Sequence, residues 1–247
     1  MASIKREASA LRDLRHPNII RYLSIDVNAE KTGIDLLLEY VPGGSIKKII
    51  DSFGSFGEKL IKVYTRQILT GLNFIHEQGI THRDLKCSNI LVDDNGVIKL
   101  SDFGFSKQTV EGLFGEAPRD PQLEDLSRRS SLNWIAPEVF QGREGQKQDV
   151  WSLGCCILEM ISGRPPFHDC DPMALPAKIS ALTEPPPYPE SVSASLRSFL
   201  DACFEVCPQK RPNAFELLCH PFVLLNNQRE VRESLDAVNS IKTYISF

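Results

Sequence analysis

The chain has 247 residues, with 28 lysines and arginines against 32 aspartates and glutamates, so its formal net charge is −4. Its 42% of hydrophobic and 24% of charged residues are typical of a globular protein and exclude a disordered or collagen-like chain. The mildly acidic balance argues against nucleic-acid binding, and no apolar run is long enough to span a membrane. A polar start untypical of a signal peptide, together with seven cysteines lacking disulfide-like spacing, indicates a cytoplasmic protein with free thiols.

The first forty residues predict a helix and two strands. Apolar residues at helical spacing, from Ile4 to Leu14, predict an opening helix that His16-Pro17 ends. Residues 19–27 and 34–40 are rich in aliphatic side chains and predict two strands around a polar turn. We expect a hinge near residues 39–44, where Pro and Gly interrupt the pattern.

The rest of the chain predicts mainly helices. Ser45 is a candidate N-cap for a short helix, and the periodic apolar residues of 58–78 predict a long one. Residues 90–92 and 97–100 flank Asn95-Gly96, which predicts a hairpin. A long polar loop at 104–133 has the character of a functional loop. Further helices are predicted at 150–161, 193–204 and 214–218, and the tail, with Val231, Leu235, Val238 and Ile241, predicts a helix that packs on its own domain or on a partner.

Three short motifs suggest the chemistry. The sequence contains His82-Arg83-Asp84-Leu85-Lys86-Cys87-Ser88-Asn89, then Asp102-Phe103-Gly104, then Ala136-Pro137-Glu138. In this order they match the catalytic loop, metal-binding turn and activation-segment end of protein kinases. Phosphoryl transfer needs positioning and charge neutralisation, which these residue types supply. Asp84 would orient the attacking hydroxyl and accept its proton, and Lys86 would hold the γ-phosphate. Asn89 and Asp102 would bind Mg²⁺ through oxygen atoms.

Over residues 4–223 the chain resembles eukaryotic protein serine/threonine kinases, most closely the mitogen-activated protein kinase kinase kinases. Residues 16–22, the hinge at 39–45, and the stretches 133–138 and 149–154 carry this finer resemblance. It implies an α+β, two-lobed fold, with a small-lobe remnant at 1–41, a large lobe at 42–223 and a tail at 224–247. It also implies ATP and Mg²⁺ as cofactors and a protein substrate, expected to be a downstream kinase.

The resemblance implies further roles by position. Glu7 matches the glutamate that pairs with the ATP-anchoring lysine, Leu38 lies at the gatekeeper position, Glu39 and Val41 would face adenine, and Leu91 would lie under it. His82, Phe103 and Leu11 match a hydrophobic spine, and Asp149 matches the aspartate that holds the catalytic loop. Glu138 and Arg211 match a buried ion pair.

The activation segment carries the expected regulatory residues. Arg83 is expected to face this segment and to pair with a phosphate there. Ser130 and Ser127 are the predicted phosphorylation sites, although a solvated polar loop explains any single hydroxyl equally well. Ser131 aligns with the threonine that contacts the catalytic aspartate, so we expect a catalytic role for it.

The chain departs from the family at its start. It contains neither the glycine-rich loop nor the Val-Ala-Ile-Lys strand that precede the helix carrying Glu7. We therefore expect a truncated form of a longer kinase. The alternative is a catalytically impaired pseudokinase or a scaffold built on the large lobe. Near the other end, Cys203, Cys207, Cys219 and His220 suggest a zinc site only weakly, and buried thiols are the preferred interpretation.

Overall fold

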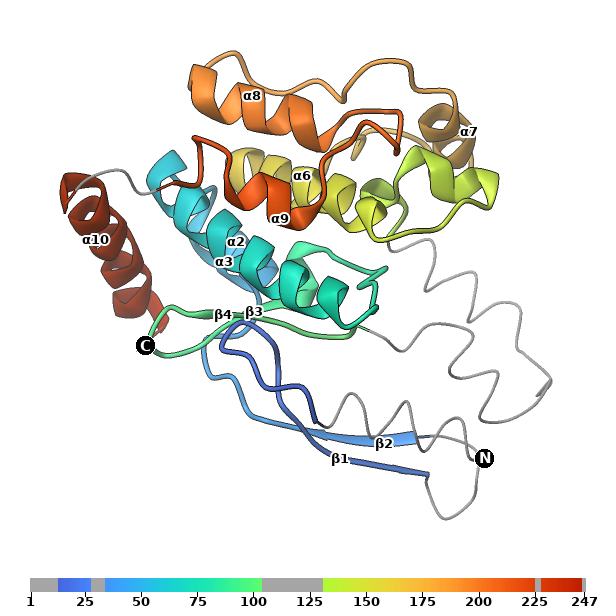
Figure 1. Cartoon of the computed structure of the whole chain (residues 1–247). Coiled ribbons are helices and arrows are strands. Elements are labelled where there is room, and N and C mark those ends of the chain that lie inside the picture. The colour runs from blue at the N-terminus through green and yellow to red at the C-terminus, as the bar shows by residue number, and fades with distance from the viewer. Residues whose placement is uncertain (1–12, 28–33, 104–130, 225–227, 246–247) are drawn as a thin grey trace.

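A computed structural model describes residues 13–27, 34–103, 131–224 and 228–245 of the chain. Its architecture is α+β, with a two-stranded sheet at one end and a larger body of helices (Figure 1). A second two-stranded sheet lies between these parts and against the helices. Glu7, Leu11, Ser127 and Ser130 lie outside the described residues.

The first sheet is an antiparallel pair, β1 (Tyr22–Val27) and β2 (Ile34–Leu38). Its register shifts between Tyr22 and Ser24, which is an irregularity of the bulge type. Both strands are shorter than predicted. Before β1 the chain pairs instead with the second sheet, where Ile20 N donates to Leu100 O at 3.0 Å and Leu100 N to Asn18 O at 2.9 Å.

The two helices after the hinge form where the sequence predicts them. The Ser45 side chain accepts a hydrogen bond from Lys48 N and caps α2 (Ile46–Phe53). The long α3 (Glu58–Glu77) buries one face, which includes Ile61, Ile68 and Leu72. That face covers the second sheet, and the helix positions the loop that follows it.

The second sheet is the hairpin that the Asn-Gly pair predicts. A 3-10 turn, η1 (Cys87–Asn89), leads into β3 (Ile90–Val92), which pairs with β4 (Ile98–Leu100). Gly96 in the turn has a φ of 71°, a region that glycine adopts without strain. The hairpin therefore places Asn89 before its first strand and Asp102 after its second.

The helical body is built around α6 (Lys147–Ser162), which is buried from Gln148 to Met160. Around it lie α7 (Leu175–Ser180), α8 (Ala194–Cys203) and α9 (Ala214–Leu218), with the 3-10 turns η2 (Leu132–Trp134) and η3 (Pro137–Gln141). The short α7 is absent from the sequence prediction, because its only buried residues are Leu175 and Ile179. Those two pack on Leu132 in a separate small cluster.

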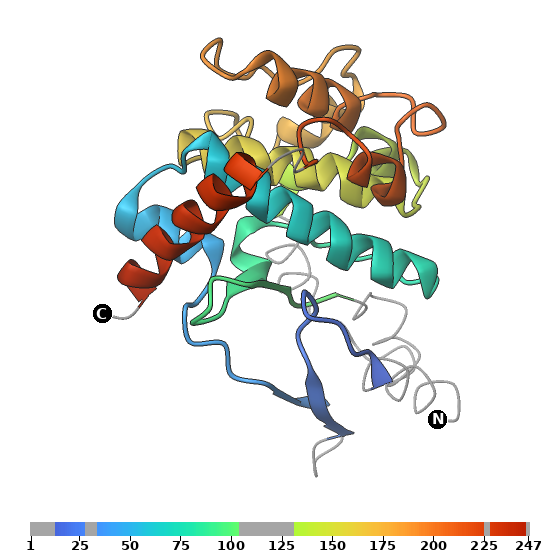
Figure 2. The same cartoon turned by 60° about the vertical axis from the view of Figure 1, so that its left-hand side comes forward.

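The tail forms α10 (Gln228–Ile245), which packs against α3 (Figure 2). Ile241 is buried and Val238 packs on the core, as the apolar spacing indicates. Leu235, however, is 58% exposed, because the packed face runs through Ala237 and Val238. Among the described residues, no helix combines the length and apolar character needed to cross a membrane.

Candidate active site

Asp149, on α6, fixes the backbone of the predicted catalytic loop. Its carboxylate accepts hydrogen bonds from His82 N at 2.8 Å and Arg83 N at 2.9 Å, and lies 2.7 Å from His76 Nε2. Asp149 is completely buried on α6. Arg83 has a φ of 68°, a strained conformation for a residue with a side chain, and the two backbone hydrogen bonds maintain it.

A chain of polar contacts joins the predicted catalytic residues. Asn89 Nδ2 donates to Asp84 O at 2.8 Å and to Asp84 Oδ2 at 2.9 Å. Lys86 Nζ lies 3.0 Å from the same Oδ2 and donates to Ser131 Oγ at 2.7 Å. Ser131 therefore reaches Asp84 through Lys86. The contact ties the end of the activation segment to the catalytic loop.

Asp102 stands at the far end of the hairpin. Its φ is 59°, and Ser101 Oγ donates to its Oδ2 at 2.9 Å and to Asn89 O at 3.1 Å. Asn89 directs its amide nitrogen to Asp84, and its side-chain oxygen, which accepts one long hydrogen bond from Ser88 Oγ at 3.5 Å, keeps a lone pair for a ligand. The donor set of Asn89 and Asp102 is thus composed of oxygen atoms, as a magnesium site requires. These residues fit the expected ion.

Phe103 packs between two rings. It lies 5.6 Å from Tyr22 in an edge-to-face arrangement and 5.9 Å from His82, measured between ring centroids. Tyr22 OH also donates to Phe103 O at 3.4 Å. Burial lowers the pKa of His82 and favours its neutral form, which suits an apolar contact. Sequence reasoning missed Tyr22, because it resembles an ordinary strand residue.

The hinge residues lie between the two sheets. Leu38 ends β2 and packs partly on the core, Val41 is buried, and Leu91 lies in β3 opposite Lys99. The Glu39 carboxylate accepts from Arg21 N at 2.9 Å and lies 3.0 Å from Lys99 Nζ. Glu39 N donates to Arg21 O, so the carbonyl of Glu39 is the backbone group that we expect to face adenine.

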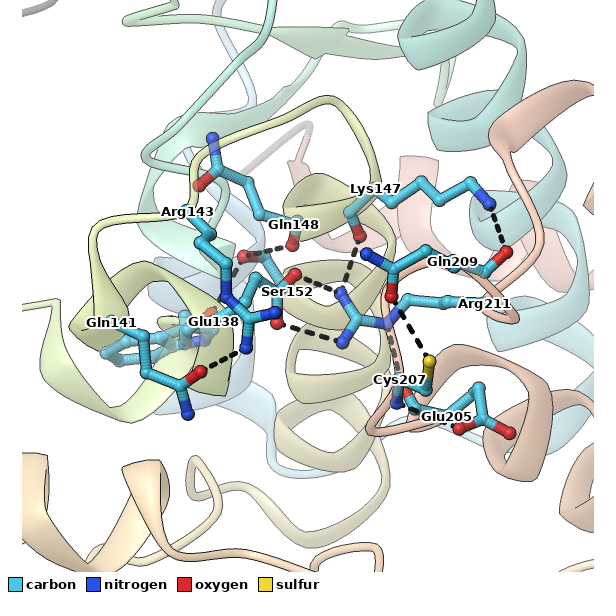
Figure 3. A network of polar contacts seen from close by, with 11 residues as sticks. Glu138, Gln141, Arg143, Lys147, Gln148, Ser152, Glu205, Cys207, Gln209 and Arg211 are labelled. Atoms are coloured by element: carbon cyan, nitrogen blue, oxygen red, sulfur yellow. Dashed lines mark hydrogen bonds and ion pairs between the residues drawn. The ribbon is translucent and has the colours of Figure 1, made fainter.

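Glu138 and Arg211 form the predicted buried ion pair (Figure 3). Arg211 Nη1 lies 2.6 Å from Glu138 Oε1 and Nη2 lies 3.1 Å from Oε2, so the pair is bidentate. The guanidinium also donates to Lys147 O and Glu205 O and lies over the Trp151 ring. With all these contacts in place, the pair joins η3, the start of α6 and the loop before α9.

Arg83 has a partner that sequence reasoning missed. Its Nε lies 3.3 Å from Glu144 Oε2, and the two side chains are 37% and 57% exposed. The Arg83 guanidinium, which we expected to pair with a phosphate, is paired with the Glu144 carboxylate instead. No local sequence pattern indicates this pairing, because Arg83 and Glu144 lie far apart in the chain.

Glu159 is a further residue that the sequence did not single out. It is fully buried on α6, and neither carboxylate oxygen has a hydrogen-bond partner among the described residues. Burial raises its pKa, against opposing effects of the Cys87 thiol, the Lys47 charge and the Trp134 indole. Cys87 belongs to η1 and Trp134 to η2. Glu159 therefore lies where the catalytic loop meets the end of the activation segment.

The cysteines do not form a metal centre in the part of the chain that the structure describes. No group of three or more His, Cys, Asp or Glu side chains converges there. Cys203 is buried, Cys207 is half-buried and Cys219 is exposed. Burial also raises the pKa of the Cys87 thiol in the catalytic loop, which disfavours the reactive thiolate.

Comparison with known proteins gives the class to which this site belongs. Residues 1–223 match the protein kinase domain family. The chain therefore belongs to the protein kinase family.

Several known kinases are similar to the chain over most of its length. The chain is 40% identical over 259 residues to serine/threonine-protein kinase BCK1/SLK1/SSP31 of Saccharomyces cerevisiae, covering 99% of this chain and 17% of that protein. It is 41% identical over 224 residues to mitogen-activated protein kinase kinase kinase A of Dictyostelium discoideum (90% and 23%). It is 39% identical over 243 residues to mitogen-activated protein kinase kinase kinase ANP1 of Arabidopsis thaliana (97% and 35%). The chain is thus similar over most of its length to kinases that carry these names, and it spans about a sixth to a third of the length of these relatives.

Proposed function

We propose that the protein transfers the γ-phosphoryl group of ATP to serine or threonine hydroxyls of a protein substrate. The observation that carries this proposal is the contact chain from Asn89 through Asp84 and Lys86 to Ser131. It joins a base, a cation and a candidate metal ligand within one loop. A loop of this composition, held at its backbone by Asp149, is suited to positioning reactants.

Each residue of the chain has a distinct role in this proposal. Asp84 orients the substrate hydroxyl and accepts its proton. Lys86 carries a charge that stabilises the transferred phosphoryl group. Ser131 holds Lys86 in place through the 2.7 Å hydrogen bond, and so links substrate binding at the activation segment to the catalytic loop.

Asn89 and Asp102 would hold Mg²⁺, with the hairpin setting their separation. The ion, when bound, neutralises phosphate charge. On the hinge side of the proposed nucleotide site, the adenine ring would contact Leu38, Glu39, Val41 and Leu91. Glu7 would complete the nucleotide site.

The relatives' names guide the choice of substrate. Mitogen-activated protein kinase kinase kinases are named for action on a downstream kinase, and we propose a substrate of that kind here. We further propose a cytoplasmic location. Seven cysteines that all remain free thiols support it.

Phosphorylation at Ser127 or Ser130 is the proposed activating event. Arg83 would pair with the new phosphate and release Glu144. The exchange is feasible because an exposed single-contact ion pair contributes about 0–1 kcal/mol, whereas a phosphate offers several charge-assisted hydrogen bonds. Phosphopeptide mapping of the active protein is expected to find phosphate between residues 105 and 133. Active protein without it would contradict this part of the proposal.

The central test is an Asp84→Asn substitution in the full natural chain. Loss of the base should lower kcat by on the order of 10²–10⁴-fold with little change in structure. Asp35→Asn serves as the matched control, since Asp35 is an exposed residue of β2. Phosphotransfer that survives Asp84→Asn unchanged would overturn the proposal. A natural chain that transfers no phosphate but binds partners would favour the scaffold alternative.

A further inference from the structure

The tail helix α10 lies beyond the part of the chain that matches the kinase domain. The match ends at residue 223, and α10 spans Gln228–Ile245. Both views show it alongside the start of α3 and beside the β3–β4 hairpin (Figures 1 and 2). It therefore contacts two elements of the catalytic domain without being one of them.

One face of α10 is packed against the domain. Ala237, Val238 and Ile241 contact the core, and Ile241 is only 5% exposed. Near the other end of the helix, Glu233 Oε2 lies 3.1 Å from Lys59 Nζ on α3. The apolar contacts supply most of the docking energy, because the ion pair is largely solvated.

Val238 of α10 lies against the hairpin turn at Gly96. A Cβ built on Gly96 would lie 2.4 Å from Val238 Cγ1, far inside van der Waals distance. Gly96 thus allows the helix to sit directly on the turn. Any side chain at this position would have to displace Val238 or the turn itself.

The hairpin connects this turn to the predicted metal ligands. Asp93 Oδ1 accepts hydrogen bonds from Asn95 N and Val97 N, both at 2.8 Å, so the turn is internally braced. Each strand has three residues, and at the open end Ser101 N donates to Asn89 O at 2.9 Å. We expect such a short, hydrogen-bonded hairpin to shift as a unit, and its far end carries Asn89 and Asp102.

We propose that α10 is a positioning element for the active site, in which Val238 bears on Gly96 and thereby holds Asn89 and Asp102 at the separation that Mg²⁺ needs. This inference rests on the proposed function, because it assumes that these two residues bind the ion. It assigns Val238 and Gly96 a role as positioning residues for a site that neither of them touches.

The test compares Val238→Asp with Leu235→Asp in the full natural chain. Both add one carboxylate to α10, but Val238 faces the turn whereas Leu235 is exposed. Val238→Asp should raise the Mg²⁺ concentration needed for half-maximal activity by up to about tenfold, the lower end of the effect of removing a group that bonds a metal ligand directly, because Val238 acts only through the hairpin. The KM for the peptide substrate should stay unchanged. Leu235→Asp should match the wild type in both.

Hydrogen exchange gives a second readout that needs neither metal nor activity. In the nucleotide-free protein, the amides of Val97 and Ser101 should exchange faster in Val238→Asp than in the wild type or Leu235→Asp. Amides of α8, far from the hairpin, should exchange as in the wild type and so show that Val238→Asp is folded.

A double substitution isolates the contact even if Val238→Asp fails to fold. Gly96→Ala should raise the Mg²⁺ requirement, and adding Val238→Ala should partly restore it, because Val238 Cβ would lie at an ordinary 3.7 Å from the new methyl group. Equal Mg²⁺ requirements and exchange rates in all variants would overturn the role of α10.

Failure of the proposed function gives a different result. In that case Asp84→Asn leaves phosphotransfer intact, or the natural chain transfers no phosphate. The exchange data alone then decide whether α10 holds the hairpin.

Discussion

Lys86 connects the two halves of the candidate site through a single ammonium group. It lies between the Asp84 carboxylate and the Ser131 hydroxyl, at 3.0 and 2.7 Å. Both partners are needed to hold it, since a lysine side chain has four rotatable bonds and loses rotamer freedom when fixed. In the proposed mechanism, the Ser131 hydroxyl acts by holding Lys86 and does not itself touch the reacting atoms.

Ser131→Ala should lower kcat by about tenfold to a hundredfold, since a hydrogen bond to a charged group contributes about 1.5–3 kcal/mol. Steady-state kinetics with saturating ATP and peptide measure it. Ser131→Thr keeps the hydroxyl and should restore most of the rate. If alanine and threonine behave alike, the hydroxyl does not position Lys86.

Glu159 should make the stability of the protein depend on pH. Its pKa in the folded state is raised above 4.5 by burial, so the folded state resists ionisation. The contribution of Glu159 to stability is therefore complete below pH 4.5 and is lost as the pH rises toward the raised pKa. Relative to the wild type, Glu159→Gln should become progressively more stable across that range. Denaturant unfolding at a series of pH values measures the difference, and a constant difference would contradict the assignment.

At the scale of elements, a close contact at Gly71 sets the distance between α3 and the second sheet. Gly71 on α3 would place a Cβ 3.0 Å from Asn18 O and 3.0 Å from Leu100 Cδ1. Asn18 Nδ2 bonds Gln67 Oε1 and Ile98 O, so its backbone has little freedom to move away. The helix thus packs directly on the residues that pair with β4.

Gly71→Ala should lower the free energy of unfolding by about 1–3 kcal/mol, because the added methyl group overpacks this contact. Gly145→Ala is the control, since a Cβ there meets nothing within 4 Å. Its unfolding free energy should remain within about 0.5 kcal/mol of the wild type. Thermal or urea unfolding compares the two variants. An unchanged stability for Gly71→Ala would show that α3 can shift away from the sheet.

At the scale of the whole molecule, the Glu138–Arg211 pair joins segments far apart in the chain. Arg211 is fully buried, and Glu138 is 4% exposed. Breaking one side of such a pair leaves an uncompensated charge in the interior. The pair therefore specifies how the end of the activation segment sits on the helical body.

Arg211→Met should lower the free energy of unfolding by about 3–5 kcal/mol. Adding Glu138→Gln should recover part of the loss, because the second change removes the buried charge that the first exposes. Urea unfolding of the two single variants and the double variant measures this coupling. Fully additive costs would show that the pair does not interact as the geometry indicates.

Elements with strong local signals could be predicted from the sequence. The cap at Ser45, the apolar period of α3 and the Asn95-Gly96 turn each specify a structure through nearest neighbours, and α9 forms as predicted at Ala214–Leu218. The shorter β1 and the unpredicted α7 depend instead on partners elsewhere in the chain. The start of β1 is decided by the pairing of residues 18–20 with β4, and α7 has only Leu175 and Ile179 to bury, so neither follows from the local pattern.

The sequence by itself determined which groups the site contains. Asp84, Lys86 and Asn89 lie within one short loop and Asp102 follows one hairpin later, so local chain geometry keeps them together. Only the tertiary structure decided what holds that loop and what surrounds it. Arg83 meets Glu144, Glu159 is buried beside Cys87 and Trp134, and Val238 rests on Gly96. The physical reason is that each of these relations joins segments distant in the chain, and burial and contact distance arise only when such segments pack together.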